Sequence, residues 1–161
     1  MNFKLLKTIL SLLLFAVLGT AGFAGEHLAP DVADFLLAIR QVESGDRYDC
    51  PPGPVGEQGP YQFKRDVWYQ HTRENFRLAR SRYADEVALM HYRWLKERLR
   101  KNDLEVSPWN LAAAWNAGVS AVVSQRIPRG TRDYANRVAN LVRADAELRR
   151  RHTPVIKIAS L

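Results

Sequence analysis

The segment 50–60 can form neither a helix nor a strand. It contains four prolines and three glycines in eleven residues. Proline lacks a backbone N–H and fixes its own φ, and glycine weakens helices and strands alike. The sequence therefore predicts a long loop here, and the core must be built from the segments on either side of it.

Those flanking segments have the hydrophobic spacing of α-helices. In 32–42 the apolar residues recur every three or four positions, after a start signal at Pro30 and Asp31 and before a stop at Gly45. Later spacing predicts a short helix around 66–71 and the longest helix over 83–101, with Met90 on its apolar stripe. Ser107 and Pro108 are predicted to begin a helix that ends at Gly118, and a short helix is predicted within 119–125. After a turn at 128–130, Thr131 is predicted to cap a last helix whose apolar stripe includes Leu141 and Leu148. We expect a mainly α, single-domain fold with a small β or loop element near 59–63.

The first 24 residues have the pattern of a secretory signal peptide. Lys4 and Lys7 precede an apolar run over 8–19, which ends near Gly22 and Ala24. The run is about 12 residues long, whereas a membrane-spanning helix needs roughly 20, so a retained anchor is the weaker alternative. We expect an exported protein, periplasmic or extracellular. Its domain is predicted to occupy 25–161, with a core over about 30–148 and a basic tail over 149–161.

The composition excludes several kinds of chemistry. Cys50 is the only cysteine, so the chain can form neither an internal disulfide nor a Cys-based zinc site. The four histidines are scattered without metal-binding spacing, and the sequence contains no Gly-x-Ser-x-Gly motif and no Gly-rich phosphate loop. We expect no metal, no cofactor, and chemistry carried out by carboxylates.

The charge of the chain restricts its partners. The net charge of +7 falls to +5 once Lys4 and Lys7 are removed with the signal peptide. Outside the cytosol a basic protein meets wall polymers and lipid head groups rather than nucleic acid, and the signal peptide also argues against a helix-turn-helix interpretation of the Ala-rich helix and the helix after it. We expect a monomer in which Arg149, Arg150 and Arg151 form a solvated tail, with an anionic wall or membrane surface as the alternative partner.

Glu43 is a carboxylate on an apolar helix face. At about 100° per residue it lies about 20° from Val32, and it follows Ile39 by four residues. Burial disfavours the anion, and so does the negative end of the helix dipole in the last turn, so both raise the pKa. Glu43 is therefore a candidate general acid. The alternative is a frayed helix end that turns Glu43 into solvent or pairs it with an arginine.

Four short motifs follow one another in an order that resembles the lytic transglycosylase branch of the lysozyme superfamily. They are Glu43-Ser44-Gly45, Gly59-Pro60-Tyr61-Gln62-Phe63, Ala114-Trp115-Asn116-Ala117-Gly118, and Thr131-Arg132-Asp133-Tyr134 followed by Val138. The resemblance spans most of the mature chain and rests on the ordered set rather than on any one motif. The turn at Gly59 also resembles that of invertebrate-type lysozymes, although that family is rich in disulfides.

The resemblance implies a lysozyme-like fold around a glycan cleft, with Glu43 as the catalytic acid and base. It implies that Tyr134 directs its hydroxyl towards Glu43 and that the substrate-binding residues are Ser44, Tyr61, Gln62, Trp115, Asn116 and Tyr134. Each of these has a structural alternative: Gln62 could tie down the loop, Asn116 could cap a helix, and the aromatic rings could belong to the core. We expect His91 to be a buried core histidine.

The implied activity is cleavage of the β-1,4 bond between MurNAc and GlcNAc in peptidoglycan, with a 1,6-anhydro product. A single glutamate, helped by the N-acetyl group of the substrate, suffices for that reaction. A hydrolytic muramidase would need a second carboxylate, for which Asp46, Asp49 and Glu57 are candidates. A protein that binds or assembles the wall without cleaving it is the remaining alternative.

Overall fold

The structure, a computed structural model, describes residues 32–152 of the 161-residue chain. Its helices are α2 (Val32–Ser44), α3 (Arg65–His71), the 3-10 helix η1 (Phe76–Arg80), α4 (Tyr83–Arg100), α5 (Pro108–Ala117), α6 (Val119–Val123) and α7 (Arg129–His152). Over these residues there is no strand, so the prediction of a mainly α fold is confirmed. The predicted signal peptide, the start signal at Pro30 and Asp31, and the tail beyond residue 152 lie outside the described residues.

The segment 50–60 is a loop, as its prolines and glycines predict. In place of a small β element, one isolated antiparallel bridge joins Gln58 to Phe63, with N···O distances of 3.0 and 2.9 Å. A turn over Gly59–Gln62 connects the two bridged residues. Gly59 has a φ of +75°, and a Cβ atom there would lie 1.6 Å from the carbonyl oxygen of Ala79. Only glycine fits this turn, because η1 packs directly against its backbone.

The predicted short and middle helices are present with their expected boundaries. Ser107 caps α5, since its Oγ accepts a hydrogen bond from the backbone N–H of Asn110 at 3.2 Å, and Pro108 occupies the first turn. Gly118, with a φ of +83°, ends α5 and begins α6. The 3-10 helix η1 was not predicted.

The last helix differs from the prediction at both ends. With 24 residues, α7 is longer than α4, which has 18, so the prediction that 83–101 forms the longest helix is wrong. It begins at Arg129 because Pro128 supplies the first accepting carbonyl, which bonds the N–H of Arg132 at 3.0 Å. Thr131 therefore lies inside the helix and caps nothing. At the other end the helix continues through the first residues of the predicted tail, because Arg149 pairs with Asp34 of α2.

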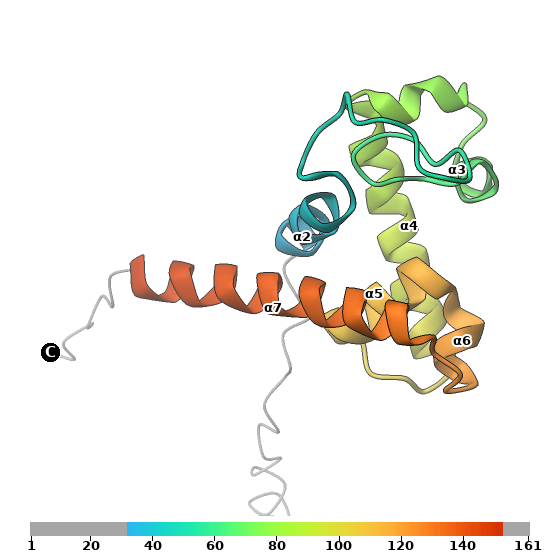
Figure 1. The fold of residues 1–161 in the computed structure, drawn as a ribbon. Coiled ribbons are helices and arrows are strands. Elements are labelled where there is room, and N and C mark those ends of the chain that lie inside the picture. Colours follow the sequence, from blue (N-terminus) through green and yellow to red (C-terminus); the bar gives the residue numbers. More distant parts are fainter. Residues whose placement is uncertain (1–31, 153–161) are drawn as a thin grey trace, which may run out of the picture.

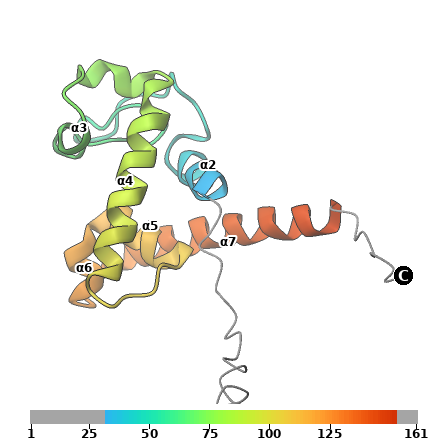
Figure 2. The same ribbon diagram turned by 180° about the vertical axis from the view of Figure 1, so that it is seen from behind.

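The helices pack around one hydrophobic core. α5 packs against α4, α6 and α7, and α2 packs against α4 and α7, while the C-terminal turns of α7 extend beyond the other helices (Figures 1 and 2). Ala112, Ala113 and Ala114 are fully or almost fully buried, and their small side chains let α5 approach its neighbours closely. Three residues expected on apolar stripes are exposed instead: Met90, Leu141 and Leu148.

No described helix is both long enough and apolar enough to cross a membrane.

Candidate functional site

Glu43 and Tyr134 meet at the crossing of α2 and α7. The Tyr134 hydroxyl donates a hydrogen bond to Oε1 of Glu43 at 2.7 Å, although 91 residues separate the two in the chain. Glu43 lies in the last turn of α2 and is only partly exposed, and Tyr134 is buried on α7. The two side chains therefore have the arrangement that the motif resemblance implies.

The carboxyl group of Glu43 has a strongly altered acidity. Burial raises its pKa to about 7, and the negative charge of Glu57 acts in the same direction. The hydrogen bond from Tyr134 and the positive charges of Arg137 and Lys64 oppose this rise. The predicted direction of the shift is confirmed, and burial is its main cause. A large fraction of Glu43 is consequently uncharged near neutral pH and able to donate a proton.

A cavity of about 710 Å³ opens beside Glu43. Its volume lies within the usual range for sites that bind small organic ligands. Besides Glu43, the residues on its wall that matter for chemistry or binding are Glu57, Tyr61, Gln62, Lys64, Asp66, Gln70, His91, Trp94, Trp115 and Asn116. Five of the seven predicted site residues, counting Glu43, thus lie on one cavity, and Tyr134 supports it through its hydrogen bond to Glu43.

Gln62 and Asn116 line the cavity and also hold the backbone around it. The Gln62 side chain donates hydrogen bonds to the carbonyl of Gly59 at 3.0 Å and to the Cys50 sulfur at 3.2 Å. Oδ1 of Asn116 accepts a hydrogen bond from the Thr131 hydroxyl at 2.6 Å, so it joins α5 to α7 rather than capping its own helix. Gln62 therefore both ties down the loop, which was the structural alternative, and lines the cavity.

Tyr61 and Trp115 form an aromatic wall that is continuous with the core. Their ring centroids lie 6.0 Å apart, and Trp115 also contacts Phe63 at 5.8 Å and His91 at 4.7 Å. Tyr61 is buried, whereas Trp115 is partly exposed. An exposed indole face can stack on a sugar ring, so Trp115 is the better placed of the two for substrate.

Ser44 does not line the cavity. Its hydroxyl donates to the carbonyl of Pro60 at 3.0 Å and accepts from the N–H of Arg47 at 3.1 Å. The side chain therefore attaches the end of α2 to the turn that carries Tyr61 and Gln62. The structure therefore does not place Ser44 on the cavity wall with the other predicted substrate-binding residues.

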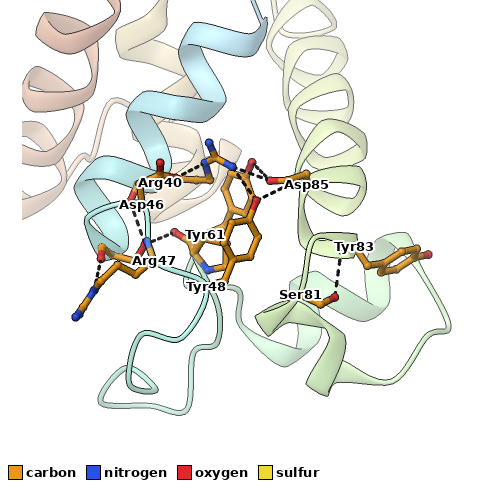
Figure 3. Close-up of polar contacts among 10 residues, drawn as sticks. Arg40, Asp46, Arg47, Tyr48, Tyr61, Ser81, Tyr83 and Asp85 are labelled. Atoms are coloured by element: carbon orange, nitrogen blue, oxygen red, sulfur yellow. Dashed lines mark hydrogen bonds and ion pairs between the residues drawn. The ribbon is translucent and has the colours of Figure 1, made fainter.

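An acidic residue that the sequence analysis missed holds this region together. Asp85, in the first turn of α4, accepts hydrogen bonds from the hydroxyls of Tyr48 at 2.6 Å and Tyr61 at 2.8 Å (Figure 3). It also binds the guanidinium of Arg40 at 3.2 Å, and Arg40 in turn pairs with Asp46 at 2.8 Å (Figure 3). Asp85 follows Tyr61 by 24 positions and Tyr48 by 37 positions, and no helical or strand spacing connects residues so far apart. Only the folded chain therefore reveals this cluster.

Of the three candidates for a second carboxylate, only Glu57 lies on the cavity. Asp46 is engaged with Arg40, and Asp49 is exposed outside the cavity wall. Oε2 of Glu57 accepts a hydrogen bond from the N–H of Val55 at 3.0 Å. A Cβ atom on Gly53 would lie 2.4 Å from that oxygen. The loop backbone therefore fixes the carboxylate of Glu57 on the wall that also carries Glu43.

His91 is buried, as predicted, and its ring Nδ1 lies 2.9 Å from Nε2 of His71. Burial lowers the pKa of His91 to about 3, so both partners in this hydrogen bond can remain neutral. Its ring is stacked on Trp94 with centroids 5.7 Å apart, at the end of the cavity lined by Trp94. Within residues 32–152, no three His, Cys, Asp or Glu side chains gather as a metal site.

The arrangement supports proton transfer by a carboxyl group to a ligand held in a cavity with aromatic and amide walls. Burial keeps Glu43 partly protonated, Tyr134 orients it, and the loop together with α3, α4 and α5 supplies the walls. In comparisons with known proteins, no protein-family model, no curated protein and no solved structure matches this chain.

Proposed function

We propose that the protein is a lytic transglycosylase with a lysozyme-like fold, which cleaves the β-1,4 bond between MurNAc and GlcNAc in peptidoglycan. The observation that carries the proposal is the carboxyl group of Glu43, uncharged in large part near pH 7, hydrogen-bonded by Tyr134 and lining the cavity. The ordered motifs from Glu43 to Val138 support the same assignment. The substrate would be peptidoglycan glycan strands, and the protein would act after export, in the periplasm or outside the cell, as a monomer.

Cleavage of a glycosidic bond needs an acid to protonate the bridging oxygen while positive charge develops at the anomeric carbon. Glu43 donates that proton as the bond between C1 and the oxygen breaks, and the GlcNAc side leaves with a free hydroxyl. The N-acetyl oxygen of MurNAc then stabilises C1. The Glu43 carboxylate takes the proton from the 6-hydroxyl of the same sugar as that oxygen attacks C1. Glu43 is thereby reprotonated, and no cofactor and no water enter the reaction.

The walls of the cavity have the chemistry that such a substrate requires. Trp115 offers an aromatic face to a sugar ring, and the amide groups of Gln62 and Asn116 can hydrogen-bond to hydroxyl and N-acetyl groups.

The proposal is tested by incubating purified sacculi with the wild-type protein and with Glu43→Gln. A general acid contributes about 10² to 10⁴ in rate, so the variant should release soluble fragments at least a hundredfold more slowly. Full activity of Glu43→Gln would refute the role of Glu43. A folded wild-type protein that sediments with sacculi but releases nothing would instead indicate a wall-binding protein without activity.

Hydrolysis is the second candidate, because Glu57 lines the same cavity as Glu43 and could activate a water molecule. Mass spectrometry of the fragments separates the two reactions. A transglycosylase leaves anhydro-MurNAc ends and should keep forming them in Glu57→Gln. A muramidase leaves reducing MurNAc ends and should lose its activity in the same variant.

A further inference from the structure

Arg137 lies one turn beyond Tyr134 on α7, on the edge of the candidate site. Its side chain is exposed, and its positive charge acts on both Glu43 and Tyr134. Residues three apart on a helix are neighbours on its surface, so Arg137 stands beside the residue that binds Glu43. The guanidinium is therefore within electrostatic reach of Glu43, the acid of the proposed function.

A second, shallower groove begins at this arginine. It lies between α2 and α7, has a volume of about 460 Å³, and is lined by Gln41, Val42, Arg137, Asn140 and Leu141. Gln41 and Val42 directly precede Glu43 in the chain. Glu43 lies on the first cavity, and the two residues before it in the chain lie on the groove.

Unlike Arg40 and Arg149, Arg137 has no acidic partner among the described residues, a property that it shares with other arginines of α7 such as Arg143. Arg40 is paired with Asp46 and Asp85, and Arg149 is paired with Asp34. No ion pair involves Arg137 in the part of the chain that the structure describes, although Asp133 stands one turn earlier on the same helix. An exposed, unpaired guanidinium beside a cavity is suited to bind a carboxylate of a ligand.

We infer that Arg137 is a specificity residue that binds a carboxylate of the peptide carried by the muramic acid residue next to the cleaved bond. This inference rests on the proposed function, under which the substrate is a neutral glycan whose negative charges lie in its peptide branches. The groove offers the rest of such a branch suitable contacts: amide groups from Gln41 and Asn140, and apolar surface from Val42 and Leu141. Strands whose peptides carry free carboxylates would then bind better than strands whose peptide carboxylates are amidated.

The test compares two substrates and four proteins. The substrates are soluble, uncrosslinked glycan strands that carry their peptides, and the same strands after every peptide carboxylate has been converted to a methyl amide. The proteins are the wild type, Arg137→Gln, Arg137→Lys as the conservative variant, and Arg143→Gln as a matched control. Arg143 is another exposed arginine of α7, and it lines neither the cavity nor the groove.

We expect Arg137→Gln to raise KM about three- to tenfold on strands with free peptide carboxylates and to leave KM on the amidated strands unchanged. Arg137→Lys should retain most of the preference, and Arg143→Gln all of it. Any effect of the lost charge on the acidity of Glu43 would change kcat on both substrates equally, so the ratio of the two KM values isolates peptide binding.

Equal KM values of the wild type for both substrates, or an equal rise on both in Arg137→Gln, would overturn the inference while leaving glycan cleavage intact. Failure of the wild type to cleave either substrate would instead refute the proposed function on which the inference rests.

Discussion

Burial raises the pKa of Glu43 to about 7, so its carboxyl group titrates near neutral pH. This property was predictable from the sequence, because the helical period alone places Glu43 on an apolar face. The residues that surround the Glu43 carboxyl group could not be predicted from the helical period. Only the motif resemblance indicated Tyr134, and nothing in the sequence indicated Asp85 or Arg137, because their contacts join residues far apart in the chain.

Replacing Tyr134 by phenylalanine should raise the pKa of Glu43 further. The Tyr134 hydroxyl stabilises the carboxylate by donating a hydrogen bond, so its removal favours the protonated form. Activity that requires protonated Glu43 should then persist to higher pH, with the falling limb of the pH profile moved up by about one unit. A limb that stays in place, or moves down, would show that Tyr134 does not control this proton.

Replacing Glu43 by glutamine should stabilise the protein at neutral and alkaline pH. The pKa of Glu43 is about 7 in the folded chain and 4.5 as the ordinary value, so the folded state binds the proton more tightly. The contribution to stability is complete below pH 4.5 and is lost as the pH rises through 7. The free energy of unfolding of Glu43→Gln should therefore exceed that of the wild type by a margin that grows by about 3 kcal/mol over this interval. Urea unfolding at several pH values measures the margin, and a constant difference would contradict the shifted pKa.

At the scale of elements, local signals predicted most of the helices and longer-range contacts decided their ends. The Ser107 cap and the Gly118 stop define α5 in the structure as they do in the sequence. The cap expected at Thr131 fails, since Pro128 starts α7 earlier and the Thr131 hydroxyl binds Asn116 instead. A short sequence pattern cannot show which of two competing cap signals the tertiary contacts favour.

The loop 50–60 should depend strongly on one of its glycines. In Gly59→Ala the new Cβ atom would collide with the backbone of Ala79, and φ is +75° there. We expect the free energy of unfolding to fall by about 3 kcal/mol or more, measured by urea denaturation. Gly56→Ala is the matched control, because φ is +86° but the space around it is open. It should cost only about 1 kcal/mol. Equal losses in the two variants would mean that the close approach of η1 is not the cause.

For the molecule as a whole, the contact between α2 and α7 is decisive, because it brings Glu43 and Tyr134 together. Besides apolar packing, the described parts of these helices are joined by the hydrogen bond at the site and by the ion pair between Asp34 and Arg149 near the far end of α7. The sequence predicted that 149–152 belongs to a solvated tail. Its charge pattern could not show that the buried carboxylate of Asp34 draws Arg149 back onto α2.

Arg149→Gln should destabilise the whole domain, because it leaves Asp34 buried without its charged partner. Since the Arg149 side chain is 51% exposed, we expect a moderate loss of about 1 to 3 kcal/mol in the free energy of unfolding. Arg150→Gln provides the control, as Arg150 is exposed on the same helical turn. Indistinguishable effects of the two substitutions would argue against the ion pair as a link between α2 and α7.

The most direct test of the account is the pH dependence of fragment release from purified peptidoglycan by the wild-type protein. If Glu43 is the acid, release should be fast below neutral pH and should fall as the pH rises through about 7, where Glu43 loses its proton. Release that already falls near pH 4.5, or no release at any pH from a folded protein, would contradict the claim that a buried, partly protonated Glu43 cleaves the glycan.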